Sequence, residues 1–155
     1  EDQEPNEKIK IYAVEKICKM LDKDYVFNSF IKLAAFLIGE YGIMLVNCKK
    51  IIYFINYLIS FLIFLVGHKT YTLEKQISLL QKHLMICSNE TIYAVLSAFV
   101  KFVNWNPNLR TLVIPVLEQY YESWDTELQQ RAMEYSILCK LDNEDPNLPN
   151  VSEIR

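Results

Sequence analysis

The sequence predicts an all-α protein made of stacked antiparallel helix hairpins, which is the architecture of a solenoid segment. Only 3 of the 155 residues are glycine and 5 are proline, and no proline lies between Pro5 and Pro107. A turn-rich sandwich or barrel is therefore excluded. Apolar residues recur at three- and four-residue steps through most of the chain, as on one face of a helix. Since 52% of the residues are apolar and 23% charged, the chain can also bury a core.

The first hairpin is expected between residues 7 and 42. Residues 7–22 predict an amphipathic helix, whose apolar positions are Ile11, Val14, Ile17, Cys18 and Leu21. A charged run at 22–24 breaks it. The second helix has an inward stripe that consists of Phe27, Phe30, Ile31, Ala34, Leu37, Ile38 and Tyr41. We expect it to end between Gly39 and Gly42, because glycine adopts the left-handed conformation of a helix cap without strain.

The second hairpin is expected between residues 70 and 107. Thr70 or Thr72 is placed to cap its first helix, and Ser88 or Asn89 its second helix. The apolar positions of the first helix are Leu73, Ile77, Leu80 and Leu84. Those of the second helix are Ile92, Val95, Leu96, Phe99 and Val103. The polar cluster at 104–107 ends this hairpin.

The third hairpin is expected between residues 107 and 141. Pro107 suits the first turn of a helix, and Pro115 is expected to bend that helix or to interrupt one of its backbone hydrogen bonds. The apolar positions of that helix are Leu109, Leu112, Val113, Val116, Leu117 and Tyr120. Asp125 is expected to cap residues 126–140, whose inward positions are Leu128, Ala132, Tyr135, Leu138 and Cys139. Residues 142–155 are too polar to pack and are predicted to be a tail or linker.

The spacing of the hairpins indicates a repeat. The second and third hairpins begin near residues 73 and 108, about 35 residues apart, which is close to the period of helical-repeat solenoids. The first hairpin begins near residue 7. It fits this period only if about 20 residues between 47 and 73 are an insertion. A helix bundle is the alternative.

Residues 51–67 form an apolar run of 17 residues without a charge. As a helix the run would span about 25 Å, which is short for a hydrocarbon core of about 30 Å. Basic residues flank both of its ends, so the charges favour neither orientation across a membrane. We expect an apolar insert that packs on the solenoid or is covered by a partner. There are two alternatives. The run is a membrane-spanning helix, or it is an insert that the functional protein does not contain.

No catalytic, cofactor-binding or metal-binding residue is predicted. The sequence has no glycine-rich phosphate loop, nucleophile motif or zinc-protease motif, so we do not expect an enzyme. The four cysteines are at least 30 residues apart and there are only two histidines. This pattern predicts buried thiols in a reducing compartment and no zinc site. A net charge of −3 offers no attraction to nucleic acid.

Two surface features are predicted to be structural. Lys16, Lys19 and Lys23 share one face of the first helix, but neighbouring acidic residues dilute this patch. A solvated face is therefore favoured over a site for anionic lipid. The aromatic side chains are expected to lie mostly in the core. Trp105 and Trp124 stand at helix boundaries, where we expect them to seal corners between helices.

Three stretches resemble a known family. Residues 125–135 read Asp-Thr-Glu-Leu-Gln-Gln-Arg-Ala-Met-Glu-Tyr, which resembles the large-chain adaptins of clathrin adaptor complexes. Residues 37–42 resemble the helix end of the same family, with its Gly-Glu-aromatic-Gly pattern. Cys87-Ser88, residues 99–104 and Pro107 resemble alpha-adaptins in particular. The gamma-adaptins of the Golgi and endosomal adaptor share the first stretch, so that stretch alone does not separate the two classes.

The resemblance implies a right-handed HEAT/armadillo-like solenoid. Residues 1–141 would belong to the carboxy-terminal half of an alpha-adaptin trunk, with an insertion at about 48–72. Such a segment is a scaffold in vesicle-mediated protein transport and endocytosis. The implied partners are a beta-class large chain and the medium and small chains, with clathrin and cargo bound indirectly.

The implied location is cytoplasmic and peripheral, on the plasma membrane at clathrin-coated pits, through the whole complex. No partner-binding residue can be carried over from the resemblance. Two alternatives stay open: a gamma-adaptin-type subunit, or an integral membrane protein anchored by residues 51–67.

Overall fold

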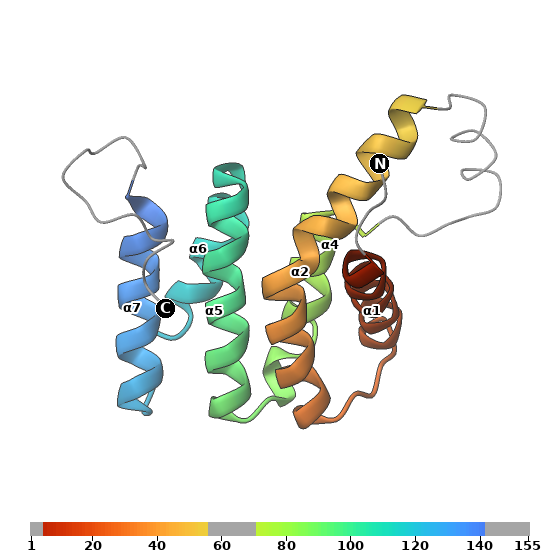
Figure 1. Cartoon of the computed structure of the whole chain (residues 1–155). Coiled ribbons are helices and arrows are strands. Elements are labelled where there is room, and N and C mark those ends of the chain that lie inside the picture. Colours follow the sequence, from red (N-terminus) through yellow and green to blue (C-terminus); the bar gives the residue numbers. More distant parts are fainter. Residues whose placement is uncertain (1–4, 56–70, 142–155) are drawn as a thin grey trace.

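The computed structural model describes residues 5–55 and 71–141, with side chains from 6 to 47 and from 71 to 141. These ranges contain helices and no strand. The α-helices are α1 (Pro5–Leu21), α2 (Asn28–Ile55), α4 (Leu73–Gln81), α5 (Asn89–Trp105), α6 (Arg110–Glu118) and α7 (Thr126–Lys140). Two 3-10 turns, η1 (Leu84–Ile86) and η2 (Pro107–Leu109), precede α5 and α6 (Figure 1).

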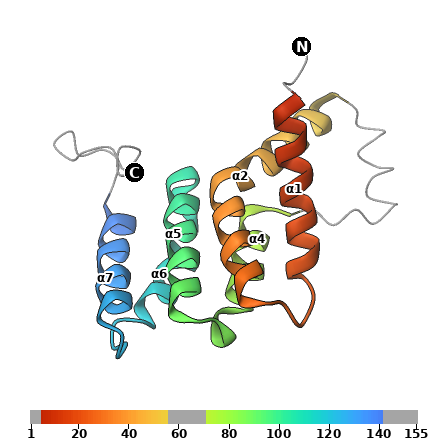
Figure 2. The same ribbon diagram turned by 60° about the horizontal axis from the view of Figure 1, so that its bottom comes forward.

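The helices form two layers. α2, α5 and α7 stand side by side in one row, with α5 in the middle, and α4 and α6 lie behind this row (Figure 1). α1 lies across α2 at one end of the row and also touches α4 (Figure 2). The pairs α1–α2, α4–α5 and α6–α7 are therefore three stacked hairpins. The prediction of an all-α helical-repeat solenoid is confirmed.

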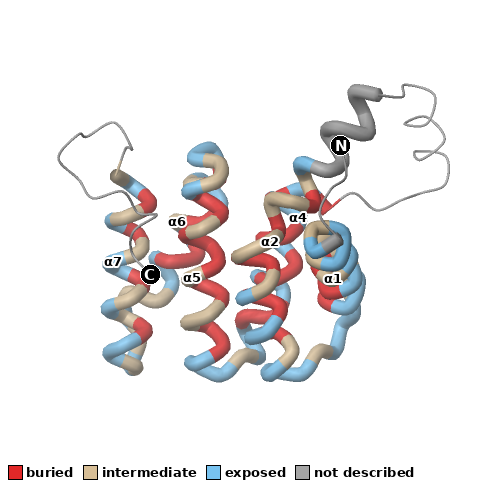
Figure 3. The backbone as a smooth tube through the Cα atoms, viewed as in Figure 1, coloured by how far each residue is buried: buried red, intermediate tan, exposed pale blue. Residues whose placement is uncertain are grey.

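One apolar core runs through all three hairpins, on the sides where the helices face one another (Figure 3). Its largest fully buried side chains include Phe99, Phe102, Ile31, Ile38, Ile77, Leu80, Leu96 and Leu117. Helix α5 alone buries nine residues. The rings of Phe102 and Trp105, both in α5, meet edge to face with their centroids 5.5 Å apart, and Trp105 is partly buried against the core. Helix α5 is thus the centre of the core.

The helix caps mostly follow the sequence. Thr72 Oγ1 accepts a hydrogen bond from the Lys75 amide at 3.3 Å. Asp125 Oδ1 accepts one from the Leu128 amide at 2.9 Å. Ser88 occupies the cap position of α5, but its hydroxyl makes no capping bond to the helix backbone. Thr70 lies outside the described residues.

Helix α6 follows its prediction in part. It continues through Pro115 and ends at Glu118, so Tyr120 lies beyond it. Leu112 is exposed, whereas its spacing predicted an inward position.

The predicted end of α2 at its two glycines is wrong. The helix continues through Gly39 and Gly42 to Ile55. A Cβ atom at Gly39 would lie 3.0 Å from the Ala98 Cβ of α5. A Cβ at Gly42 would clash with Oε1 of the buried Gln76 of α4. Both glycines therefore let neighbouring helices approach α2 closely and do not cap it.

The predicted insertion at 48–72 is partly a continuation of α2, because that helix includes residues 48–55. Residues 56–70 lie outside the described residues, so the packing of the apolar run 51–67 stays a prediction. Within the described part, the stretch Asn28–Asn47 of α2 is long and apolar enough to cross a membrane by length and composition. It packs against α1, α4 and α5, and 39% of the stretch is buried.

Candidate interaction surface

The turns within the three hairpins lie along one edge of the solenoid, at the bottom of Figure 1. We call this surface the turn edge and define it as residues 22–28, 82–90 and 119–127. Since each hairpin contributes one turn, the edge follows directly from the stacking of the hairpins.

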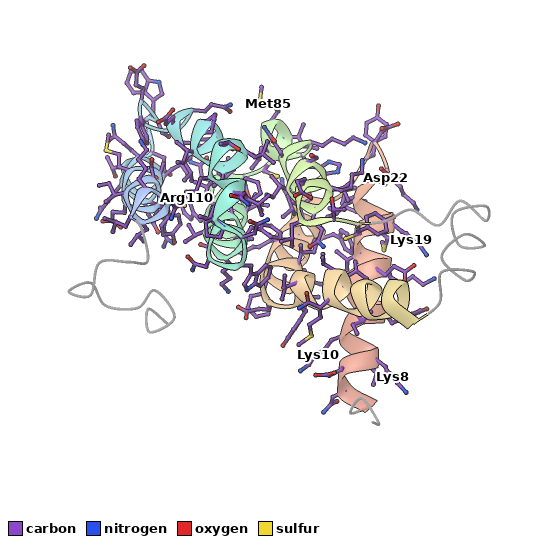
Figure 4. The ribbon with its side chains drawn as sticks, turned by 90° about the horizontal axis from the view of Figure 1, so that it is seen from above. Lys8, Lys10, Lys19, Asp22, Met85 and Arg110 are labelled. Atoms are coloured by element: carbon purple, nitrogen blue, oxygen red, sulfur yellow. The ribbon has the colours of Figure 1, made fainter. Side chains whose placement is uncertain are left out.

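Large apolar side chains point into solvent from every one of these turns. Their exposed fractions are 93% for Tyr25, 87% for Phe27, 94% for Met85, 59% for Ile86 and 103% for Trp124. Met85 projects from the rim of the molecule (Figure 4). Turns usually carry polar residues, and apolar side chains gathered on a surface mark interaction sites.

Two sequence predictions fail on this edge. Phe27 was placed on the inward stripe of α2, but it precedes the helix and is exposed. Trp124 was expected to seal a corner between helices, but it too is exposed. An amphipathic pattern cannot reveal such residues, because it assigns apolar side chains to the core. A large apolar residue beside turn-forming residues was the signal available.

Hydrogen bonds join the first turn to the second. The Lys82 ammonium donates to the carbonyl oxygens of Asp22 and Lys23, both at 3.2 Å, and to Asp24 Oδ1 at 2.9 Å. The Ser88 amide donates to Asn28 Oδ1 at 3.1 Å. These bonds hold the loop between α1 and α2 against the second hairpin.

A buried histidine joins the same two hairpins. His83 is 1% exposed, and its Nε2 lies 2.8 Å from the Leu21 carbonyl oxygen, which accepts a hydrogen bond from the ring N–H. Buried polar groups need such partners. The bond satisfies a carbonyl that the end of α1 leaves without a partner inside the helix.

Asp125 joins the second turn to the third. Its Oδ2 accepts from the Asn89 amide at 2.8 Å, and its Oδ1 accepts from the Tyr93 hydroxyl and from the Leu128 backbone amide, both at 2.9 Å. The Leu128 amide, followed by Tyr93 and Asn89, lowers the pKa of Asp125. Partial burial, together with the bond to Asp125, raises the pKa of Tyr93 to about 12. All three turns are therefore held in fixed relative positions.

Acid titration tests the role of Asp125. Because its folded-state pKa lies below the ordinary value of 3.8, ionised Asp125 stabilises the folded chain above about pH 4. This stabilisation is expected to be lost as the pH falls through the folded-state pKa. Asp125→Asn keeps a capping oxygen but removes the charge. The urea midpoint of this variant is expected to fall less between pH 5 and 3 than that of the unchanged chain; equal falls would contradict the role.

The outer face of α5 and α7 carries a second polar contact. The Tyr135 hydroxyl lies 3.1 Å from Ser97 Oγ, and the Arg131 guanidinium lies 5.0 Å from the centre of the Tyr93 ring. Tyr135 is half-buried, whereas its spacing predicted a core position. Tyr135 therefore packs at the edge of the contact between α5 and α7.

Tyr135→Ala is therefore expected to cost about 2 kcal/mol of unfolding free energy. A fully buried aromatic ring would cost about 3–5 kcal/mol, and the lost hydrogen bond about 1 kcal/mol. Tyr135→Phe serves as the control, since it removes only the hydroxyl, and is expected to cost about 1 kcal/mol or less. Chemical unfolding of both variants measures these values. A cost for Tyr135→Ala above about 4 kcal/mol would restore the core assignment.

The lysines predicted to share a face of α1 are partly engaged. The Lys19 ammonium lies 2.6 Å from Glu15, and Lys16 lies over the Tyr12 ring at 5.3 Å from its centre. Lys19, together with Lys8 and Lys10 of the same helix, is labelled in Figure 4. Lys23, the third lysine of the predicted face, lies beyond the end of α1 at Leu21. The preference for a solvated face over a lipid site stays a prediction.

The cysteines fit the prediction of structural thiols. Cys18 and Cys139 are buried and Cys87 is half-buried, while the side chain of Cys48 lies outside the described residues. Burial raises the pKa of Cys139 to about 11 and also raises that of Cys87, so both are protonated and unreactive at neutral pH. Among the described residues, no group of three His, Cys, Asp or Glu side chains could hold a metal ion.

A pocket of about 450 Å³ lies between the middle of α2, the start of α4 and the end of α5. It is lined by Ile43, Val46, Asn47, Thr72, Leu73, Glu74, Trp105 and Asn106. Glu74 is the one ionisable residue in this lining. The pocket therefore offers no pair of groups for acid–base chemistry.

Comparison with known proteins agrees with this architecture. The family model described as "Adaptin N terminal region" matches residues 4–143, which include all three stacked hairpins. The chain belongs to the adaptin family. The matched model describes the amino-terminal region of adaptins, so an origin in the carboxy-terminal half of the trunk stays a prediction.

Adaptin relatives align over most of the chain. It is 28% identical over 142 residues to "AP-2 complex subunit alpha-1" of Arabidopsis thaliana, which covers 87% of the chain and 12% of the relative. It is 29% identical over 140 residues to "AP-2 complex subunit alpha-2" of Dictyostelium discoideum, and the alignment covers 90% of the chain and 12% of the relative. It is 23% identical over 136 residues to "AP-2 complex subunit alpha" of Schizosaccharomyces pombe, and the alignment covers 88% of the chain and 13% of the relative. The adaptin chain thus spans about an eighth of the length of these relatives.

Proposed function

We propose that the chain is a scaffold segment of the large subunit of a clathrin adaptor complex, acting in vesicle-mediated protein transport and endocytosis. The adaptin family match over residues 4–143 carries this proposal. The relatives named as alpha subunits of AP-2 complexes favour the alpha class. A gamma-type subunit of the Golgi and endosomal adaptor is the second candidate, because residues 125–135 resemble both classes.

The proposed mechanism is the presentation of surfaces in a fixed geometry. The hairpins share one buried core, so each repeat is stabilised by its neighbours. The bonds of Lys82, Ser88 and Asp125 add polar connections between successive turns. A rigid solenoid can hold partner subunits at set distances. The role is non-enzymatic and needs no catalytic residue, cofactor or metal.

The proposed partners are a beta-class large chain and the medium and small chains, with clathrin and cargo bound indirectly. The proposed location is cytoplasmic and peripheral, at clathrin-coated pits of the plasma membrane. Within the chain, residues 1–141 are proposed as a trunk segment, from the carboxy-terminal half of the trunk, and 142–155 as a tail or linker.

Affinity purification of the tagged full-length product from its own cells, followed by mass spectrometry, tests this proposal. We expect a beta-class chain together with the medium and small chains of the endocytic adaptor. Medium and small chains of the Golgi type would assign the gamma class. If no adaptor subunit is recovered and extraction requires detergent, the scaffold role is wrong, and a membrane protein anchored by residues 51–67 takes its place.

A further inference from the structure

We propose that the turn edge is a docking surface for a protein segment that carries both apolar and basic side chains. The proposal extends the scaffold role to a particular surface, but it rests on the geometry and charge of this edge. It does not depend on which adaptor complex contains the chain.

The apolar part of the recognition comes from all three turns. Tyr25 and Phe27, Met85 and Ile86, and Trp124 each expose most of their side chain. An occupant that covers them removes this apolar area from water, which is worth about 25 cal/mol for each Å². Aromatic and methionine side chains are enriched at the centres of protein interfaces.

The edge is organised before any partner arrives. Lys82 holds the first turn through three acceptors, Ser88 bonds to Asn28, and Asn89 bonds to Asp125. The turns therefore lose little conformational freedom on binding. Reducing this entropy cost is how a preformed surface gains affinity.

Charge indicates the chemistry of the occupant. The turn edge contains six carboxylates, which are Asp22, Asp24, Glu90, Glu122, Asp125 and Glu127, against two lysines, Lys23 and Lys82. Lys32 and Arg131 lie next to the edge and pair with Glu90 and Glu127. Even when both are counted, carboxylates outnumber basic groups six to four. An acidic surface attracts a basic partner and repels an anionic membrane.

The third turn shows how such a partner would bind. Trp124 is fully exposed and stands between Glu122 and Asp125 in the sequence. A lysine or arginine of the partner can place its cation over the indole face while it pairs with Glu122.

The test uses the whole chain and two short amphipathic model peptides with the same apolar pattern, one of leucine and lysine and the other of leucine and glutamate. We measure Kd by calorimetry, and the emission of Trp124 in a Trp105→Phe background. The lysine peptide is expected to bind at least about tenfold more tightly than the glutamate peptide, to shift the emission of Trp124 to the blue, and to weaken with added salt.

Matched variants locate the site. Phe27→Gln combined with Met85→Gln, and separately Trp124→Gln, are each expected to weaken binding of the lysine peptide at least about tenfold. Ile9→Gln combined with Ile137→Gln is the control, since these residues are 65% and 60% exposed but lie outside the turn edge. All these side chains are exposed, so unchanged thermal unfolding is expected and is checked for each variant.

Several results would overturn the proposal. If the two peptides bind with equal Kd, charge does not select the occupant. If the control variant loses as much affinity as the turn variants, the peptide does not bind at the turn edge. If the chain binds vesicles containing phosphatidylserine and loses this binding in the turn variants, the occupant is a membrane. If sedimentation shows a dimer that Trp124→Gln dissociates, the occupant is a second copy of the chain.

Discussion

Gly39→Val is expected to destabilise the folded chain by about 3 kcal/mol, the upper part of the range for overpacked sites. Even a Cβ at this position would lie 3.0 Å from the Ala98 Cβ and 3.2 Å from the Ala98 Cα. Branched methyl groups would force α2 and α5 apart. This is the contact between the first two hairpins of the row, so little of the core can relax around the change.

A compensating substitution separates this reason from a helix-cap role. Ala98→Gly removes the nearer of the two Ala98 atoms that a Cβ at position 39 would meet, so Gly39→Ala is expected to cost less in an Ala98→Gly background than alone. Urea unfolding of the unchanged chain, Gly39→Ala, Ala98→Gly and the double variant gives the coupling free energy between the two positions. If Gly39 were a left-handed cap, Ala98→Gly would give no rescue. Unchanged stability of Gly39→Val would show that the helices do not approach closely here.

Phe99→Ala is expected to cost about 3–5 kcal/mol of unfolding free energy, as for other buried aromatic rings. Phe99 is 0% exposed and lies in α5, which contacts both α2 and α7. The substitution leaves a cavity where the hairpins meet. Because whole domains have only about 5–15 kcal/mol of stability, the substitution would remove a large fraction of the free energy of unfolding.

Phe36→Ala is the matched control for this prediction. Phe36 lies in α2 and is 58% exposed, so its truncation is expected to change stability by about 0.5 kcal/mol or less. Thermal unfolding followed by circular dichroism measures both variants. Similar losses at the two positions would mean that α5 is not the centre of the core.

Local chemistry explains which elements the sequence could predict. The helices near residues 7–22, 73–84, 89–105 and 126–140 follow from apolar periodicity, and the caps at Thr72 and Asp125 follow from their side-chain oxygens. These signals act within one turn of helix. They need no information from distant parts of the chain.

The candidate surface was hidden from the same reasoning. Phe27 and Trp124 are large apolar residues of the kind that usually lie in a core. Only the stacking of the hairpins leaves them exposed to solvent. Tyr135 lies on the predicted inward side of α7 but reaches only the edge of the contact between α5 and α7, where its hydroxyl lies 3.1 Å from Ser97 Oγ. Burial depends on which neighbour covers a side chain, and a single helix pattern does not contain that neighbour.

Local patterns along the chain were enough to predict the helices, the caps at Thr72 and Asp125, the repeat of hairpins and the resemblance to adaptins. The tertiary structure alone decided that Gly39 and Gly42 are sites of close helix approach, since a glycine permits either a cap or a tight contact and the opposing Ala98 and Gln76 make the choice. It also decided that three separate turns form one edge. Periodicity and capping are interactions between residues near in sequence, whereas packing and exposure arise between residues that only the fold brings together.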